Sequence, residues 1–352
     1  MISVPNAVII GGLTIGIVFG VVGLLSGFCL TTGLRHWWTA RDGRAIRTFA
    51  LALTVALVGT QSLVAAHLVD TGQSLYLQPS FSIPLMLCGG MLFGYGMVAA
   101  NACVSRALVL LGCGNVRSLV VITTVAVTAE ATLRGLLAPL RLTLLSWSQT
   151  KSSIISLPEL VTAFGLDASV ARALTVAIAA ILLLSFSLGH ARFRRSIGQL
   201  AAGVIVGLLV PAGWLVTGYW GADPFEPAPV ASLTFVAPTA DTLQYVMFST
   251  GSVLNFGIAL VAGVLVGSFV TALLSGRFEL VGFDSVRHML RSIGGAALMG
   301  IGGALALGCS IGQGLTGLST LSIASLVAAT GIMLGAAAAL VSPARVPAAA
   351  RA

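Results

Sequence analysis

Long apolar stretches separated by short polar segments recur along the whole chain. Each stretch is about 20 residues long, which matches the roughly 30 Å hydrocarbon thickness of a bilayer for an α-helix. We place nine membrane-spanning helices at residues 7–28, 45–66, 82–101, 117–138, 172–189, 198–217, 252–275, 290–307 and 319–341. The pattern predicts an all-α integral membrane protein.

Two polar interruptions are too rich in proline and charge to cross the membrane. Residues 140–170 contain Lys151, Pro158 and Glu159, and we expect short amphipathic helices that lie along the interface. Residues 218–250 contain four prolines, and we expect an external loop with a short helix starting near Asp241.

Composition agrees with a membrane environment. The 352 residues are 57% hydrophobic and only 8% charged, whereas soluble domains carry about 25% charged residues. The first charged side chain is Arg35, so the N-terminus lacks the basic segment of a cleaved signal peptide. We expect one transmembrane domain over residues 1–352, with approximate halves 1–165 and 170–342 and a tail at 343–352.

Charge is distributed unequally between the two sets of loops. Alternate loops and the tail hold most of the 18 basic residues, namely Arg35, Arg41, Arg44, Arg47, Arg106, Arg117, Arg192, Arg194, Arg195, Arg277, Arg287, Arg291, Arg345 and Arg351. The positive-inside rule therefore predicts an external N-terminus and a cytoplasmic C-terminus. These arginines are scattered over short loops, so we interpret them as topology signals beside the lipid bilayer and expect no nucleic-acid partner.

Three cysteines share a distinctive setting in which a glycine-rich apolar run ends, the cysteine follows, and a polar segment begins. They are Cys29 in GVVGLLSGFCLTTGLR, Cys103 in GYGMVAANACVSR and Cys309 in GIGGALALGCSIGQGLTG. When the segments are aligned on the cysteine, Gly20, Gly94 and Gly300 coincide, Gly96 matches Gly302, and Gly89 matches Gly295. The sequence therefore contains a weak internal repeat.

The direction of the spans makes this repeat an inverted one. Cys103 ends the third span and Cys309 ends the eighth, so the two segments cross the membrane in opposite directions, as in many transporters. Clustered glycine, serine, threonine and glutamine indicate broken or re-entrant helices, which persist at membrane depth only when buried or lining a wet cavity. Free backbone N–H groups at such breaks can bind an anion.

The remaining cysteines and the motif content of the sequence give no indication of a metal, nucleotide or redox site. Cys88 and Cys113 are expected to be ordinary buried residues, because free cysteine is among the most buried residue types. The sequence has no CxxC pair, no metal-ligand spacing and no phosphate-binding GxxxxGK[ST] loop. No histidine adjoins a cysteine, so a thiol enzyme is disfavoured. We expect a transporter without metal or cofactor.

The chain resembles the YeeE/YedE-type sulfur transporters over nearly its whole length. The resemblance rests on GYGMVAANACVSRALVLLGCGNVRSLVV (94–121), ATLRGLLAPLR (131–141), PTADTLQYVMFSTGSVLNFG (238–257) and the segment 275–322, which contains GCSIGQGLTGLS. It implies an hourglass-shaped protein of the bacterial inner membrane that takes up thiosulfate, with the thiols of Cys29, Cys103 and Cys309 lining its constriction. A small TusA-like sulfur-carrier protein is the implied cytoplasmic partner.

This sequence departs from the family pattern at Asn101 and Ala102, where glycine-rich sequence is commoner, and this departure leaves the substrate open. Sulfite and selenite are alternative substrates. A sulfurtransferase activity is a less favoured alternative function. We expect Asn101, Ser310 and Gln313 to assist the thiols in passing the anion. Arg35 and Arg106 either draw the anion inward or only set topology.

One further charged pair falls within an expected span. Glu130 and Arg134 are four residues apart on the fourth span, where an unpaired charge would be costly. We expect a structural ion pair, with proton coupling as the alternative role. The sequence leaves energy coupling and oligomeric state undetermined.

Overall fold

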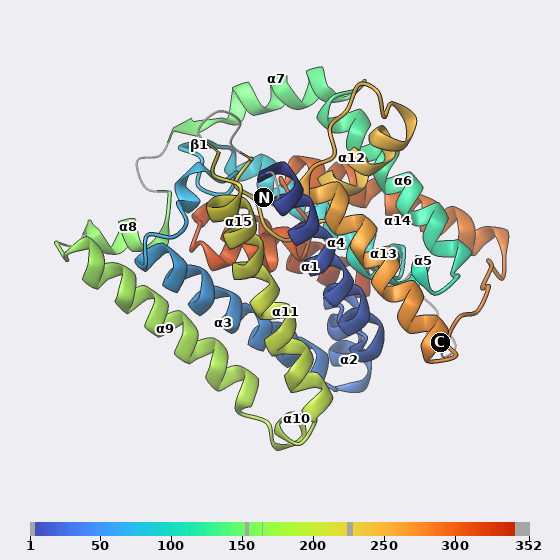
Figure 1. The fold of residues 1–352 in the computed structure, drawn as a ribbon, viewed down its shortest axis with the longest axis horizontal. Coiled ribbons are helices and arrows are strands. Elements are labelled where there is room, and N and C mark those ends of the chain that lie inside the picture. Colours follow the sequence, from blue (N-terminus) through green and yellow to red (C-terminus); the bar gives the residue numbers. More distant parts are fainter. Residues whose placement is uncertain (1–3, 152–154, 164, 224–227, 342–352) are drawn as a thin grey trace.

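A computed structural model describes residues 4–151, 155–163, 165–223 and 228–341, and its helices are shown in Figure 1. The tail expected at 343–352 lies outside these residues. The α-helices are α1 (Val4–Ser26), α2 (Leu30–Ala40), α3 (Arg44–Ala65), α4 (Ile83–Ala99), α5 (Val104–Gly112), α6 (Val116–Leu133), α7 (Ala138–Ser148), α8 (Leu157–Thr162), α9 (Ala168–Leu188), α10 (Ala191–Arg194), α11 (Ile197–Leu215), α12 (Val236–Met247), α13 (Phe256–Leu274), α14 (Val286–Leu305) and α15 (Ile323–Val341). A 3-10 turn, η1 (Thr71–Gln73), and two π-helical segments, η2 (Val216–Trp220) and η3 (Gly312–Gly317), complete them.

The multi-pass helical architecture is confirmed. Eight helical segments in the described part of the chain are long and apolar enough to cross a membrane, compared with the nine expected. The span expected at 290–307 forms α14, which is 20 residues long but is not among the eight. Its first half carries Arg287, His288 and Arg291, and its second half is rich in glycine, so its mean hydropathy is low.

Short polar residues set where several helices begin. The side chains of Ser82, Asn115, Asn255 and Ser285 each accept a hydrogen bond from a backbone N–H in the first turn of α4, α6, α13 and α14, respectively. These caps satisfy donors that a helix end leaves free, which matters most where water is scarce. The starts of α4 and α6 lie one residue from the expected positions, and the starts of α13 and α14 lie four residues from them.

Glycines allow the main helix pairs to approach closely. Gly12, Gly16 and Gly20 of α1 lie successively along α13, and a Cβ at Gly16 would come within 2.2 Å of the Leu260 carbonyl oxygen. Gly203 and Gly207 of α11 lie in the same way along α3. The helices of each pair, α1 with α13 and α3 with α11, run parallel. Because glycine has no side chain, the backbones of each pair can contact each other directly.

The glycines of the internal repeat meet across one antiparallel helix pair. Gly89 of α4 lies against Gly302 of α14, and Gly96 lies against Gly295. In the repeat, Gly89 corresponds to Gly295 and Gly96 corresponds to Gly302. Each glycine of α4 therefore contacts the counterpart of the other α4 glycine, and not its own counterpart. A two-fold axis through a helix pair produces this pattern of contacts. In addition, α4 packs on α15 and α14 packs on α6.

The two polar interruptions contain short helices, as expected. Residues 140–170 include most of α7 and all of α8, although 152–154 and 164 fall outside the described residues. The helix expected near Asp241 begins at Val236. One short antiparallel pairing, β1 (Ser80–Phe81) with β2 (Thr150–Lys151), is an exception to the all-α architecture and connects two of the polar segments.

Contacts between helix ends gather the arginine-rich loops on one face. Arg47 of α3 donates to the Phe186 carbonyl at the end of α9, and Gln199 of α11 donates to the Ser26 carbonyl at the end of α1. The loop after α13 meets the turn after α5 through Glu279 N–H and the Cys113 carbonyl. We call this the arginine face, and we call the face carrying Asp70, Asp223 and Asp241 the opposite face.

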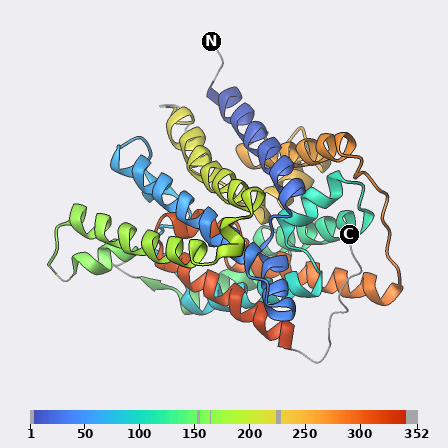
Figure 2. The same cartoon turned by 90° about the horizontal axis from the view of Figure 1, so that it is seen from below.

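The most peripheral span is α9. Figure 1 shows it along one edge of the molecule beside α3, and it stays at an edge in the perpendicular view of Figure 2. Only 6% of its most apolar window is buried within the protein, whereas 61% of the corresponding window of α11 is buried. Most of the surface of α9 is therefore available to contact lipid, whereas most of the α11 window packs against other parts of the protein.

We predict that Gly295→Ala lowers the free energy of unfolding by about 1–3 kcal/mol, as overpacking of a tight interior does. The added methyl carbon would lie 2.6 Å from the Ala100 backbone nitrogen. The neighbouring Gly294→Ala is the matched control, because no atom lies within 4 Å of a Cβ there. Thermal unfolding in detergent measures both, and equal stability of the two variants would contradict the packing described for α4 and α14.

Candidate functional site

The three cysteines lie at three helix breaks. Cys29 separates α1 from α2, Cys103 separates α4 from α5, and Cys309 lies between α14 and η3. Each break has a residue in the left-handed region two positions before the cysteine, namely Gly27 (φ 67°), Asn101 (φ 63°) and Leu307 (φ 55°). A residue in the left-handed region therefore ends all three helices. After glycine, asparagine is one of the few residues that adopt this conformation readily. This gives Asn101 a backbone role that the sequence analysis missed.

Two of the three thiols are in direct contact. Cys29 Sγ lies 3.4 Å from Cys103 Sγ, and both residues are buried. The hydroxyl of Ser105 lies 3.3 Å from Cys103 Sγ. Thr31, two residues after Cys29, has a buried hydroxyl without a hydrogen-bond partner. The breaks of α1 and α4 thus form one cluster of weak donors, of which sequence reasoning identified only the thiols.

Cys309 occupies a separate position. Its sulfur accepts a hydrogen bond from the Gly312 backbone N–H at 3.3 Å, in the turn that leads into η3. Among the described residues, no hydrogen bond joins the Cys309 thiol to the Cys29–Cys103 pair. The structure therefore arranges the three thiols as a pair and a single site.

Two stacked phenylalanines lie beside these cysteine breaks. Phe28 precedes Cys29 and stacks on Phe49 of α3, with ring centroids 5.8 Å apart and planes inclined by 17°. The far edge of Phe49 lies against Gly314 of η3, where a Cβ would be 3.2 Å from its Cζ. The aromatic pair therefore bridges the break at Cys29 and the π-helix that follows Cys309.

Arg35 and Arg106 bind the ends of broken helices reciprocally. Arg35, which follows Cys29, donates to the Asn101 side chain and to the Val98 carbonyl at the end of α4. Arg106, which follows Cys103, donates to the Gly23 carbonyl at the end of α1 at 3.1 Å. Each guanidinium offsets the negative end of the other helix dipole. This arrangement fixes the two breaks against each other.

Ser310 and Gln313 are both buried within the turn after Cys309. The Gln313 amide donates to the Ala306 carbonyl at 2.6 Å, and its side-chain oxygen has no partner. Its donor is therefore used to stabilise the break after α14. The free atom that Gln313 offers is an acceptor, which suits a thiol or a water molecule better than an anion.

The two remaining cysteines differ from each other. Cys113 is buried as expected, and its thiol donates to the Val109 carbonyl at 3.2 Å. Cys88 is exposed, so the expectation that it is buried was wrong. The helix α4 uses Gly89 and Gly90 to contact α14 and α15, which leaves the preceding Cys88 on its outer surface.

The pair of Glu130 and Arg134 lies at a helix end. Arg134 Nη1 lies 3.0 Å from Glu130 Oε2 and 2.8 Å from Asp241 Oδ1 of α12. Arg134 is the C-cap of α6, and its side chain is 52% exposed. The sequence placed this pair inside a span, but the arginine bridges α6 and α12 on the opposite face.

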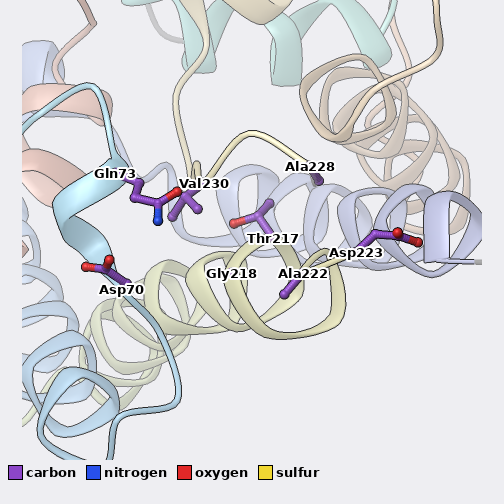
Figure 3. Close-up of a pocket in the computed structure, with 8 residues that line it drawn as sticks. All are labelled: Asp70, Gln73, Thr217, Gly218, Ala222, Asp223, Ala228 and Val230. Carbon is purple, nitrogen blue, oxygen red and sulfur yellow. The ribbon is translucent and has the colours of Figure 1, made fainter. Parts of the chain in front are cut away.

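A pocket of about 330 Å³ opens on the opposite face (Figure 3). It is lined by Asp70, Gln73, Thr217, Gly218, Ala222, Asp223, Ala228 and Val230. The lining contains two carboxylates, those of Asp70 and Asp223, and no lysine or arginine. Asp70 accepts a hydrogen bond from the Gly72 backbone N–H and so caps η1. The described residues contain no group of three or more His, Cys, Asp or Glu able to hold a metal ion.

We predict that Arg35→Ala weakens the contact between the two breaks. A membrane-permeant trivalent arsenical bonds two neighbouring thiols at once, so the wild-type protein should bind it at Cys29 and Cys103. Binding should fall by about tenfold in Arg35→Ala, because the lost hydrogen bonds involve a charged group. Arg44→Ala, which removes only a surface pair with Asp42, is the control. Equal arsenical binding by both variants would show that Arg35 does not position the thiols.

The chain is similar to known proteins over most of its length. A family model described as sulphur transport matches residues 25–338 and so includes all three breaks. The chain is similar to the thiosulfate transporter TsuA of Escherichia coli (strain K12), with 27% identity over 88% of this chain and 87% of that protein. It is also similar to the thiosulfate transporter TsuA of Spirochaeta thermophila, with 25% identity over 92% of this chain and 96% of that protein. The chain belongs to the sulphur-transport family and is a multi-pass membrane transporter, not an enzyme.

Proposed function

We propose that this protein carries thiosulfate across the bacterial inner membrane along a path lined by Cys29, Cys103 and Cys309. The observation that carries the proposal is the contact of Cys29 and Cys103 at 3.4 Å, formed by two helix breaks in a sulphur-transport family member. The two similar transporters are named for thiosulfate. All three thiols are buried, and each lies two residues after a left-handed residue at a helix break. This shared setting supports a shared role in lining the path.

The chemistry of the path suits a soft divalent anion. Thiosulfate has a terminal sulfur and three sulfonate oxygens, and a fixed cation at the constriction would hold it too tightly for release. A thiol is a weak donor, and successive weak sites allow an ion to enter and leave. The hydroxyl of Ser105, 3.3 Å from Cys103 Sγ, supplements the thiol pair.

The contacts suggest an order along the path. An anion entering from the opposite face meets Cys309 first, passes the stacked Phe28 and Phe49, and reaches the Cys29–Cys103 pair. Arg35 and Arg106 then lie on the exit side, toward the arginine face. Because both guanidinium groups are occupied with helix ends, we assign them a positioning role and no direct anion binding.

The gathering of basic loops on one face supports the proposed orientation. With the arginine face in the cytoplasm, the N-terminus lies outside and the chain satisfies the positive-inside rule. A TusA-like sulfur carrier that accepts the imported sulfur would dock on this face, as the family resemblance implies. The exposed Arg44 belongs to this surface.

The packing supports an inverted repeat with an hourglass form. The glycines of α4 and α14 contact one another in the pairs that a two-fold axis between these helices would generate. The same axis would relate α15, which packs on α4, to α6, which packs on α14. Two oppositely directed breaks, at Cys103 and Cys309, then approach the centre from the two faces. Such an arrangement places the constriction at the repeat interface.

We predict that Cys29→Ala, Cys103→Ala and Cys309→Ala each lower thiosulfate uptake by about tenfold or more, since each removes one site of a serial path. Uptake of radiolabelled thiosulfate into proteoliposomes measures this. Cys88→Ala and Cys113→Ala are matched controls because neither thiol lies at one of these three breaks. Full activity in all three path variants would overturn the proposal.

Orientation can be tested with single cysteines in a variant that lacks Cys88. We expect Arg194→Cys to be protected from a membrane-impermeant maleimide in intact cells, whereas Asp241→Cys should react, because the two positions lie on opposite faces. Reaction after permeabilisation confirms that Arg194→Cys is accessible. The reverse labelling pattern would place the arginine face outside.

A further inference from the structure

Trp214 carries a buried donor that nothing in the described structure satisfies. Its side chain is fully buried near the end of α11, and its indole Nε1 has no hydrogen-bond partner. An indole N–H can only donate, and leaving a buried donor unpaired is costly. A phenylalanine would fill similar space without that cost, so the N–H itself requires an explanation. The π-helix η2 begins two residues later, and such segments are frequent at functional sites.

The surroundings of Trp214 lead directly to the turn after Cys309. The ring of Tyr76 meets the Trp214 ring edge-on, with centroids 6.1 Å apart. The hydroxyls of Tyr76 and Thr234 both face Gly312, where a Cβ would lie 3.4 Å and 2.6 Å from them. The backbone N–H of Gly312 is the donor to Cys309 Sγ. A series of contacts thus leads from Trp214 of α11 through Tyr76 to the turn that holds the Cys309 thiol.

The pocket of Figure 3 adjoins the same elements. Its lining residue Gln73 lies three residues before Tyr76, and its lining residue Thr217 lies three residues after Trp214. The pocket thus lies on the same two elements as the aromatic pair, and Trp214 and Tyr76 are buried behind it without lining it.

The donors near Cys309 are neutral. They consist of an indole N–H, a phenolic hydroxyl and a threonine hydroxyl, which bind sulfonate oxygens through hydrogen bonds without an opposite charge. The oxygens of thiosulfate are hard acceptors, whereas its terminal sulfur is soft and matches a thiol. A site that holds both ends of the anion needs these two kinds of group side by side.

We propose that Trp214 Nε1–H and Tyr76 Oη–H form a binding subsite for the sulfonate oxygens of the anion whose terminal sulfur meets Cys309. This inference rests on the proposed function. It assigns Trp214 and Tyr76 to substrate binding, and it makes the region around Gly312 the first specific site on the path.

The test is the concentration dependence of radiolabelled thiosulfate uptake by Trp214→Phe in proteoliposomes. We expect KM to rise by about tenfold while the maximal rate stays within about twofold, as the loss of one hydrogen bond to a charged ligand predicts. Trp147→Phe is the matched control, because Trp147 is 82% exposed on α7. Unchanged KM in folded Trp214→Phe would overturn the subsite.

Tyr76→Phe provides a second test of the subsite if Trp214→Phe does not insert into the membrane or does not fold. It removes only the hydroxyl beside Gly312, and we expect KM to rise by about threefold or more, with the aromatic contact retained. Unchanged KM in this variant would equally overturn the subsite. Failure of the proposed function has a different signature, since the wild-type protein itself would then show no thiosulfate uptake.

Discussion

A broken helix in a membrane leaves backbone N–H and carbonyl groups that lipid cannot satisfy, and this constraint shapes the rest of the structure. The three breaks at the cysteines meet it in different ways. Arginines from the neighbouring broken segments bind carbonyls at the ends of α1 and α4. At the end of α14, the Gln313 amide binds the Ala306 carbonyl instead. Other buried groups, such as the Thr31 hydroxyl and the Trp214 N–H, have no hydrogen-bond partner among the described residues.

The breaks can be held this closely because glycine removes the side chains between helices. The α4–α14 pair and the α1–α13 pair are backbone contacts, in which almost any side chain would collide with a carbonyl or amide group. Lipid offers little hydrophobic drive for helices to associate, so close packing must supply much of the stability. In our proposal the same glycines define the two-fold relation that brings oppositely directed breaks toward the centre.

The sequence predicted the helical membrane architecture, most span positions and the breaks at the three cysteines, because hydropathy and glycine clusters are local signals. It misjudged Cys88 because α4 is apolar on all sides, so no periodicity reveals which face meets lipid. It placed Glu130 and Arg134 inside a span because the end of α6 has no sequence signal as clear as its start. The Cys29–Cys103 contact and the role of Trp214 depend on contacts between distant segments, which spacing along the chain does not encode.

In our proposal, the thiols select an anion by its soft sulfur. Competition against radiolabelled thiosulfate uptake in proteoliposomes tests it most directly, with sulfate, sulfite and selenite each supplied in large molar excess. We expect little inhibition by sulfate, which offers the thiols only hard oxygens, and strong inhibition by unlabelled thiosulfate. Inhibition by sulfate as strong as that by thiosulfate would contradict selection by the thiols.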